Sequence, residues 1–135
     1  MESELSSALM QALQSRGWYH RKMHGSEYQD GIPDYLLLTP RRVVVMAEAK
    51  VLPTRRPHMG NVMKALRPSQ RKFLCDARGQ HCGVIGFTPN GPRPMVWIPA
   101  ESLPPLLTDL DSLSSTTLDS WSMTYLDFAQ KLEAL

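Results

Sequence analysis

Two acidic residues and a lysine have types and a spacing that suit chemistry on a phosphate ester. Asp34 follows the turn-forming residues 31–33, and Glu48-Ala49-Lys50 ends the second of two apolar runs. Because side chains alternate along a strand, Glu48 and Lys50 share a face. Two carboxylates at close range repel each other, and a hard divalent cation such as Mg²⁺ or Mn²⁺ removes that conflict. The pattern therefore predicts a metal site with a lysine beside it.

The reaction that such a site supports is hydrolysis of a phosphodiester. Asp34, Glu48 and the backbone carbonyl of Ala49 can form one side of an octahedral metal shell, which water and a substrate phosphate complete. Lys50 can then orient or deprotonate the attacking water and offset the phosphate charge. Taken singly, Asp34 can be an ordinary turn residue, and Glu48 and Lys50 a solvated pair on a strand. Their position at the ends of adjacent apolar runs favours the catalytic interpretation.

The pairing register decides whether these side chains meet. The two apolar runs between Asp34 and Glu48 predict a β-hairpin. A three-residue connection pairs Thr39 with Val43 and places Asp34 opposite Glu48. A two-residue turn instead places Asp34 opposite Ala47. We therefore predict the three-residue connection or a compensating bulge.

Basic charge is concentrated directly after this motif. Residues 1–100 hold 14 of the 15 Lys and Arg and 7 of the 13 acids, whereas residues 101–135 hold one Lys and six acids. The stretch from 51 to 75 contains no acid, and its basic residues are Arg55, Arg56, Lys64, Arg67, Arg71 and Lys72. Such a stretch attracts a polyanion, and a phosphate backbone is the obvious candidate. A solvated surface with counter-ions elsewhere in the fold is the alternative.

The bulk properties are those of one globular domain. A length of 135 residues, 42% apolar and 21% charged, permits a real core and argues against wholesale disorder. No apolar run approaches a membrane span and no targeting signal stands out, so we expect a cytoplasmic protein without a membrane partner. Cys75 and Cys82 lack the spacing of a metal or disulfide motif and are expected to be reduced thiols.

Periodicity and turn residues predict an α/β fold with a central mixed sheet of four to five strands flanked by helices. The expected elements are a helix over 4–16 with Ser3 as N-cap, an extended segment over 18–24, the hairpin above, a loop over 52–68 with a helical turn near 61–66, a helix over 68–78, and paired strands over 83–87 and 95–98.

The segment after residue 100 forms an acidic extension with its own apolar pattern. Its apolar residues recur at steps of three and four, which predicts one helix with an apolar seam made of Leu118, Trp121, Tyr125, Phe128, Leu132 and Leu135. The seam can pack on the chain's own sheet or first helix, or it can form a subunit contact. We therefore divide the chain into a core over 1–100 and an extension over 101–135.

The order of these motifs resembles the PD-(D/E)xK nuclease superfamily. The resembling residues are 31–34, the hairpin and 48–50. The run 66–70, followed by 73–74 and Gly79, is similar to the glutamine-bearing helix of the virus-type replication-repair nuclease branch (VRR-NUC). The likeness covers about residues 4–87, and the extension has no recognised counterpart. It implies a restriction-endonuclease-like core.

The resemblance also implies roles for two further residues. Gln70 is expected beside the strand of the active site, with a hydrogen bond to Lys50 or to a phosphate. An acid of the first helix, Glu4 or alternatively Glu2, is expected to complete a second metal position. The simpler interpretations are an exposed glutamine at Gln70 and a first-turn acid favoured by the helix dipole at Glu4.

In function, the resemblance implies a metal-dependent, structure-selective DNA endonuclease. Small members of the resembled branch act on branched DNA, so a Holliday junction or a flap is the implied substrate, in replication, recombination or repair. Resolution of a junction requires two active sites, and the C-terminal seam is one candidate for a homodimer contact. A non-catalytic DNA-binding or assembly protein that retains the fold is the main alternative, and an RNA nuclease is a third.

Overall fold

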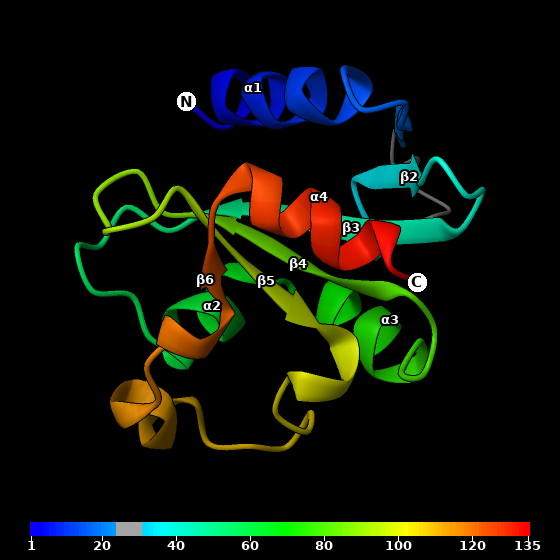
Figure 1. Ribbon diagram of the computed structural model, residues 1–135. Coiled ribbons are helices and arrows are strands. Elements are labelled where there is room, and N and C mark those ends of the chain that lie inside the picture. The colour runs from blue at the N-terminus through cyan, green and yellow to red at the C-terminus, as the bar shows by residue number, and fades with distance from the viewer. Residues whose placement is uncertain (24–30) are drawn as a thin grey trace.

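The structure is a computed structural model and describes residues 1–23 and 31–135. Figure 1 shows a central sheet with helices on both of its faces. In chain order the helices and strands are α1 (Glu2–Gln14), β1 (Tyr19–Lys22), β2 (Tyr35–Leu38), β3 (Val44–Val51), α2 (Met59–Ala65), α3 (Pro68–Asp76), β4 (Cys82–Phe87), β5 (Met95–Pro99), the 3-10 turns η1 (Ala100–Ser102), η2 (Leu110–Ser115) and η3 (Asp119–Trp121), β6 (Ser122–Met123) and α4 (Tyr125–Glu133).

The strands of the described residues form one sheet in the order β1-β2-β3-β4-β5-β6. β3 and β4 pair in parallel, and the other neighbouring pairs are antiparallel. A parallel pair needs a crossover, which the α2 and α3 segment supplies. The predicted mixed α/β fold is confirmed. The sheet has six strands rather than four or five because the short β6 of the tail adds to β5.

The sheet separates two hydrophobic cores. On one face, α1 and α4 pack over the alternate side chains Val45, Ala47 and Ala49 of β3. On the other face, α2 and α3 pack over β4 and β5 in a second cluster. Because side chains alternate along β3, Glu48 points to the face that α3 covers. The layer arrangement therefore decides which helix can reach Glu48.

The hairpin has the predicted three-residue connection. The Thr39 N–H donates to the Val43 carbonyl at 3.0 Å, and the Arg42 N–H donates to the Thr39 carbonyl at 2.8 Å. Arg42 closes the turn with a positive φ of 70°. The β2–β3 register continued by one residue sets Asp34 opposite Glu48. The prediction of this register is confirmed.

The predicted boundaries of the N-terminal and central helices are nearly right. α1 begins at Glu2 with Met1, not Ser3, as its N-cap residue. The helical turn expected near 61–66 is the two-turn helix α2. No helix within residues 1–23 and 31–135 is long and apolar enough to cross a membrane.

The predicted single helix through the tail is wrong. α4 begins only at Tyr125, and the Thr124 hydroxyl caps it by accepting a hydrogen bond from the Asp127 N–H at 3.1 Å. Just before this cap, Met123 is extended and pairs with Met95 of β5. The strand pairing interrupts the helical seam, because an extended segment cannot continue a helix.

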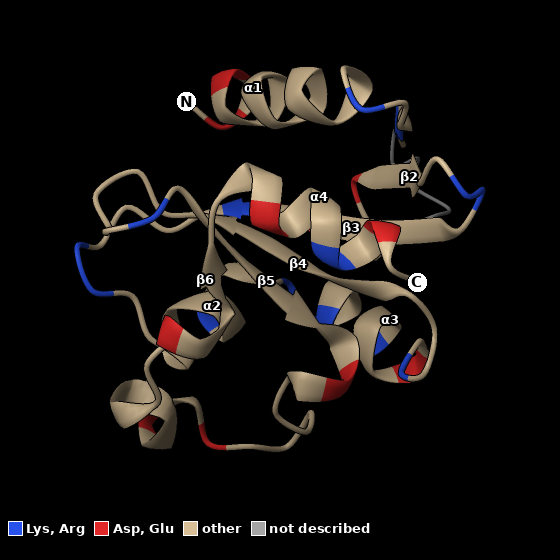
Figure 2. Cartoon of the chain, viewed as in Figure 1, with Lys and Arg blue, Asp and Glu red and all other residues tan. Residues whose placement is uncertain are grey.

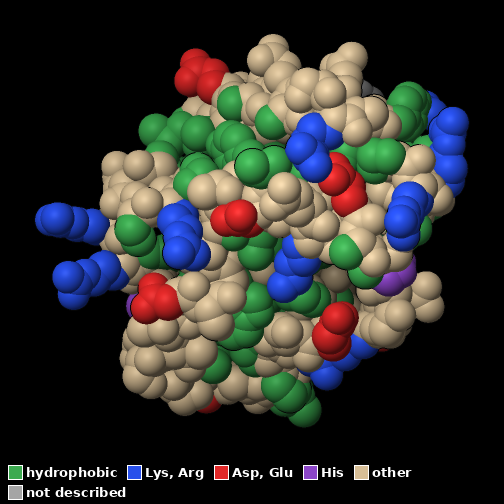
Figure 3. Space-filling view, viewed as in Figure 1, with side chains coloured by type: hydrophobic (Ala, Val, Ile, Leu, Met, Phe, Trp, Pro, Cys, Tyr) green, Lys and Arg blue, Asp and Glu red, His purple; other side chains and the backbone are tan. Residues whose placement is uncertain are grey.

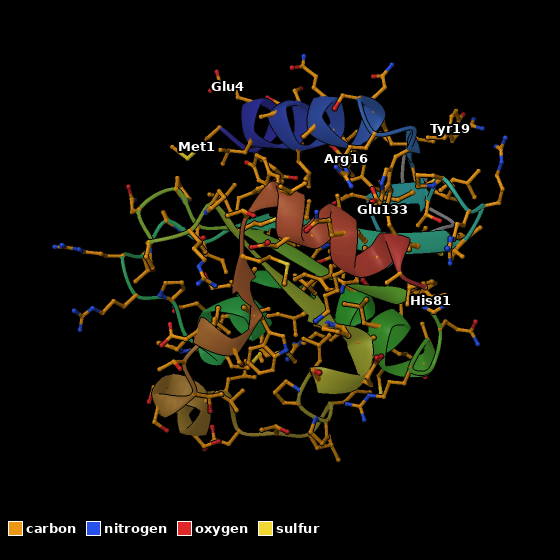
Figure 4. All side chains as sticks on the ribbon, in the orientation of Figure 1. Met1, Glu4, Arg16, Tyr19, His81 and Glu133 are labelled. Carbon is orange, nitrogen blue, oxygen red and sulfur yellow. The ribbon has the colours of Figure 1, made fainter. Side chains whose placement is uncertain are left out.

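The apolar side chains of the tail are buried within their own chain. Leu118, Phe128 and Leu132 are at most 5% exposed. An ion pair joins the end of α4 to the region after α1, with Arg16 Nη2 at 2.6 Å from Glu133 Oε1 (Figure 4). Packing on the chain's own sheet, one of the two predicted alternatives, is therefore confirmed. The three buried residues are not available for the predicted subunit contact.

Candidate active site

Asp34 is anchored to the backbone of β3. Its Oδ2 accepts a hydrogen bond from the Ala49 N–H at 3.1 Å. This N–H points to the β2 side of the strand, at a position where β2 has not yet begun, since that strand starts at Tyr35. The carboxylate of Asp34 thus takes the place of a ladder carbonyl, and the bond fixes it next to Glu48.

Glu48 is a buried carboxylate with one satisfied oxygen. The residue is 1% exposed, and its Oε1 accepts a hydrogen bond from Gln70 Nε2 at 2.8 Å. Lys50 Nζ lies 3.8 Å from the same oxygen. The second oxygen, Oε2, is buried and has no hydrogen-bond partner among the described residues. An unpartnered buried carboxylate oxygen is costly, so a proton or a cation is expected there.

The electrostatics agree with this expectation. Burial raises the pKa of Glu48 to about 8, and the neighbouring Asp34 carboxyl adds to the increase. The positive charges of Lys50 and Arg67 act in the opposite direction without cancelling it. Near neutral pH, the Glu48 carboxyl group therefore keeps its proton or requires a cation in its place.

Gln70 is oriented by the start of α3. Arg67 is the N-cap residue, and its backbone N–H donates to Gln70 Oε1 at 2.8 Å. Because the amide oxygen is used at the cap, the amide NH₂ group is directed at Glu48. The structure brings Gln70 to the strand, as expected. Its hydrogen-bond partner there is Glu48 rather than Lys50, and a contact with a phosphate stays a prediction.

A close contact at Gly31 holds the Asp34 turn against α3. Gly31 has a φ of +95°, and a Cβ at this position would lie 2.6 Å from the Ser69 carbonyl oxygen. Only glycine satisfies both the left-handed backbone and the close approach. The contact joins the segment that carries Asp34 to the helix that carries Gln70.

Replacing Gly31 with alanine is expected to reduce the free energy of unfolding by about 2–4 kcal/mol, because backbone strain and overpacking add at this site. Gly79→Ala is the matched control. Gly79 also has a positive φ, of +87°, but a Cβ there would meet nothing within 4 Å, so the expected loss is only about 1 kcal/mol. Urea denaturation measures both values, and equal losses would contradict the role of the Ser69 contact.

The structure does not bring Glu4 to the two carboxylates. Glu4 is exposed and projects from α1 away from the sheet (Figure 4), and Glu2 is exposed as well. The apolar side of α1 packs on the sheet face opposite to the one that Glu48 faces. Within residues 1–23 and 31–135, no group of three or more His, Cys, Asp or Glu could hold a metal ion. The acidic set described is therefore the pair Asp34 and Glu48.

The six basic residues of the 51–75 stretch have different surroundings. Lys64 Nζ lies 3.4 Å from Asp111 Oδ1 of the tail, and Lys72 Nζ lies 2.8 Å from Asp76 Oδ2. The stretch contains no acid in its sequence, but acids from outside it compensate the charge of two of its lysines. Arg67 is close enough to Glu48 to influence its pKa, and Arg71 is half-buried on α3. Figure 2 shows basic positions on the loop between β3 and α2, where Arg55 and Arg56 are exposed.

The donor set fits a divalent metal ion. The pair Asp34 and Glu48 supplies oxygen ligands, and the buried Glu48 Oε2 is in need of a partner. The Ala49 N–H donates a hydrogen bond to Asp34. In an antiparallel strand the N–H and the carbonyl of one residue point to the same side, so the Ala49 carbonyl also points toward Asp34. Oxygen ligands of this kind are those that Mg²⁺ and Mn²⁺ prefer.

Comparison with solved structures identifies a similar fold. No family model and no curated protein matches the chain. The structure of Hjc, a Holliday junction resolvase from Archaeoglobus fulgidus, matches with a TM-score of 0.51 and 17% sequence identity, and the match covers 73% of this chain and 77% of that chain. At this identity the likeness shows the fold, so the expected nuclease-like α/β architecture is confirmed. The narrower resemblance to the VRR-NUC branch stays a prediction.

Proposed function

We propose that this chain is a divalent-metal-dependent endonuclease that hydrolyses phosphodiester bonds in branched DNA. The observation that carries the proposal is the buried carboxylate of Glu48, which has one unpartnered oxygen beside Asp34 and has Lys50 Nζ at 3.8 Å from its other oxygen. The fold shared with a Holliday junction resolvase supports a branched substrate. The motif order further supports membership of the PD-(D/E)xK superfamily and its VRR-NUC branch.

Asp34, Glu48 and the Ala49 carbonyl would hold Mg²⁺ or Mn²⁺. When bound, the ion activates water and neutralises charge on the phosphate. Gln70 occupies Oε1 of Glu48 and so leaves Oε2 for the ion. Lys50 presents an ammonium group on the same face, where it orients the attacking water and balances the phosphate charge.

Selectivity for branched DNA would come from contacts with the phosphate backbone. Arg67 lies near Glu48, and Arg55 and Arg56 follow the same strand. Phosphate contacts position the substrate without identifying bases, so recognition by shape is the consistent mode. Cutting two strands of a junction requires two such sites, and we propose a homodimer through a surface other than the buried tail residues.

The test is a panel of labelled junction, flap and duplex DNA, incubated with Mg²⁺ or Mn²⁺. Cleavage of the branched substrates is expected from the wild type and not from Asp34→Ala or Lys50→Ala. The matched controls are Asp76→Ala and Lys64→Ala, whose side chains form exposed ion pairs away from the carboxylate pair. Binding without cleavage on every substrate in both metals would support the non-catalytic DNA-binding alternative and contradict the enzyme.

The stabilisation that Mg²⁺ gives is expected to increase with pH. The unfolded chain ionises Glu48 near its ordinary pKa of 4.5, whereas the folded metal-free protein keeps the proton up to about 8. The contribution of that proton to the free energy of unfolding is fully present below pH 4.5 and is lost as the pH rises through about 8. A cation that replaces the proton therefore stabilises more at pH 8 than at pH 6. Thermal unfolding with and without Mg²⁺ measures this difference, and a pH-independent shift would contradict it.

A further inference from the structure

A groove lies beyond the C-terminal ends of the parallel strands β3 and β4. Its volume is about 740 Å³. Three segments line it, together with Val96 of β5: the loop between β3 and α2, the connection from β4 to β5, and part of the tail between 114 and 122. In open α/β sheets, the carboxyl ends of parallel strands are the usual place for a ligand. The groove contains neither Asp34 nor Glu48, so it is separate from the carboxylate pair.

Hydrogen bonds tie the three segments together. The Met59 N–H donates to the Thr116 carbonyl at 2.8 Å, which joins the start of α2 to the tail. Asn90 Nδ2 donates to the Pro53 carbonyl at 2.6 Å, which joins the β4–β5 connection to the loop after β3. The walls of the groove are therefore fixed by the fold and need not form when a ligand binds.

The lining side chains suit an anion. Arg55 and Arg56 are exposed members of the lining, and Figure 3 shows basic side chains projecting on the side of the molecule where their loop lies. His58 adds an imidazole that packs against Gly60, where a Cβ would lie 2.9 Å from Nδ1. Asp119 is the one acid among the lining residues of this groove. The balance of charge is positive, which favours phosphate.

The rest of the lining suits a nucleoside. Pro57 and Pro92 give the lining accessible apolar surface, and Val96 and Leu118 form a buried apolar floor beneath it. A surface of this kind can receive the face of a base, while the Asp119 carboxylate can accept a hydrogen bond from an exocyclic amine. Pockets of about 300–1,000 Å³ accommodate ligands of the size of one or two nucleotides and exclude a duplex.

We propose that this groove binds one or two nucleotides of an unpaired DNA strand, with the phosphates at Arg55 and Arg56. The inference rests on the proposed function for its choice of DNA, and it adds the part of the branched substrate that the chain grips. The sheet register aligns Lys50 of β3 with Gly86 of β4 and Gly86 with Val96 of β5, which is a lining residue. The groove is therefore placed at the strand ends beside Lys50, where it can receive the strand next to the cut. A branch point supplies such a strand, whereas an intact duplex does not.

Four of the basic residues of the 51–75 stretch fall into two pairs with different surroundings. Arg55 and Arg56 line the groove, whereas Lys64 and Lys72 lie outside it and face Asp111 and Asp76. The double variants Arg55→Ala/Arg56→Ala and Lys64→Ala/Lys72→Ala remove the same charge from the same stretch. They are therefore a matched pair.

The experiment is fluorescence anisotropy with a labelled single strand and its duplex, in EDTA so that no cleavage occurs. The arginine double variant is expected to bind the single strand about tenfold more weakly or worse. The slope of the logarithm of the binding constant against the logarithm of salt concentration is expected to be smaller by about 1.4, because two phosphate contacts are lost. The lysine double variant is expected to stay within about twofold of the wild type, because its charges are already paired.

A second variant tests the cavity itself. Ser114→Trp changes an exposed lining residue, keeps both arginines and fills the groove, so it is also expected to lose single-strand binding. Equal losses in the two double variants, equal losses for single strand and duplex, unchanged binding by Ser114→Trp, or tighter binding of an RNA strand of the same sequence would each overturn the proposal.

The two proposals fail in different ways. If the wild type cuts no DNA in any metal but the binding pattern above holds, the endonuclease is contradicted and the groove stands. If the wild type cuts branched DNA but the arginine variant binds and cuts like the lysine variant, the groove is contradicted and the endonuclease stands.

Discussion

Glu48→Gln is expected to abolish cleavage and, at the same time, to make the metal-free protein more stable at pH 8. Glutamine keeps the shape of the side chain, and its carbonyl oxygen can still accept the hydrogen bond from Gln70. Its NH₂ group takes the place of the unpartnered Oε2 and can donate a hydrogen bond to the Asp34 carboxylate. The buried negative charge disappears, and with it a metal ligand.

The expected sizes of the two effects are large. Loss of a ligand to the catalytic metal reduces the cleavage rate by about 10³-fold or more. The free energy of unfolding at pH 8 rises by something on the order of 2 kcal/mol, since each unit by which the pKa of Glu48 is raised is worth about 1.36 kcal/mol. Single-turnover cleavage and urea denaturation measure the two quantities.

The control for this substitution is Glu101→Gln, which removes an exposed carboxylate. It is expected to change neither the cleavage rate nor the stability. A Glu48→Gln protein that is less stable than the wild type at pH 8 would show that the carboxylate is not under electrostatic strain. One that still cuts DNA would show that it is not a ligand.

Lys50→Met is expected to separate catalysis from metal binding. Methionine retains the apolar stem but not the ammonium group that lies 3.8 Å from Glu48. We expect cleavage to fall by about 10²-fold or more, because the water and the phosphate lose their positive partner. The stabilisation by Mg²⁺ is expected to persist, since both carboxylates remain.

A second readout follows from the charge of Lys50. This charge lowers the pKa of Glu48, so its removal is expected to shift the onset of Mg²⁺ stabilisation to higher pH. Cleavage rates and thermal unfolding across pH check both effects, with Lys64→Met as the control for loss of a surface charge. Equal behaviour of the Lys50 and Lys64 variants would contradict a role for Lys50 at the site.

The geometry of the carboxylate pair was open to prediction because local rules determine it. The two-residue period of a strand and the length of the turn fix which residue opposes Glu48, and the observed three-residue connection follows from them. The helix from Pro68 was equally accessible, since proline suits a first turn. Such features depend on neighbours in sequence.

Other parts of the fold depend on contacts between distant segments. Helical periodicity places Glu4 on one side of α1 but does not say which face of the sheet the helix covers. The tail has a helical pattern from Leu118, yet pairing of Met123 with Met95 makes part of it a strand. Contacts between distant segments decide the outcome at both places.

The same limit applies to charge and to cavities. The acid-free stretch from 51 to 75 suggested uncompensated basic charge, but Asp111 of the tail lies beside Lys64 in space. The groove has walls from three separate segments, and no single one of them carries a recognisable motif. Only the folded arrangement distinguishes the arginines that line it from the lysines that do not.

The most direct measurement is the cleavage of a labelled four-way DNA junction in Mn²⁺, with the wild type and Glu48→Gln compared at equal concentration. We predict nicked junction strands from the wild type and none from the variant, because the carboxylate pair must hold the metal ion. Intact junction with the wild type in both Mn²⁺ and Mg²⁺, or equal product from the two proteins, would contradict a metal-dependent nuclease centred on Asp34 and Glu48.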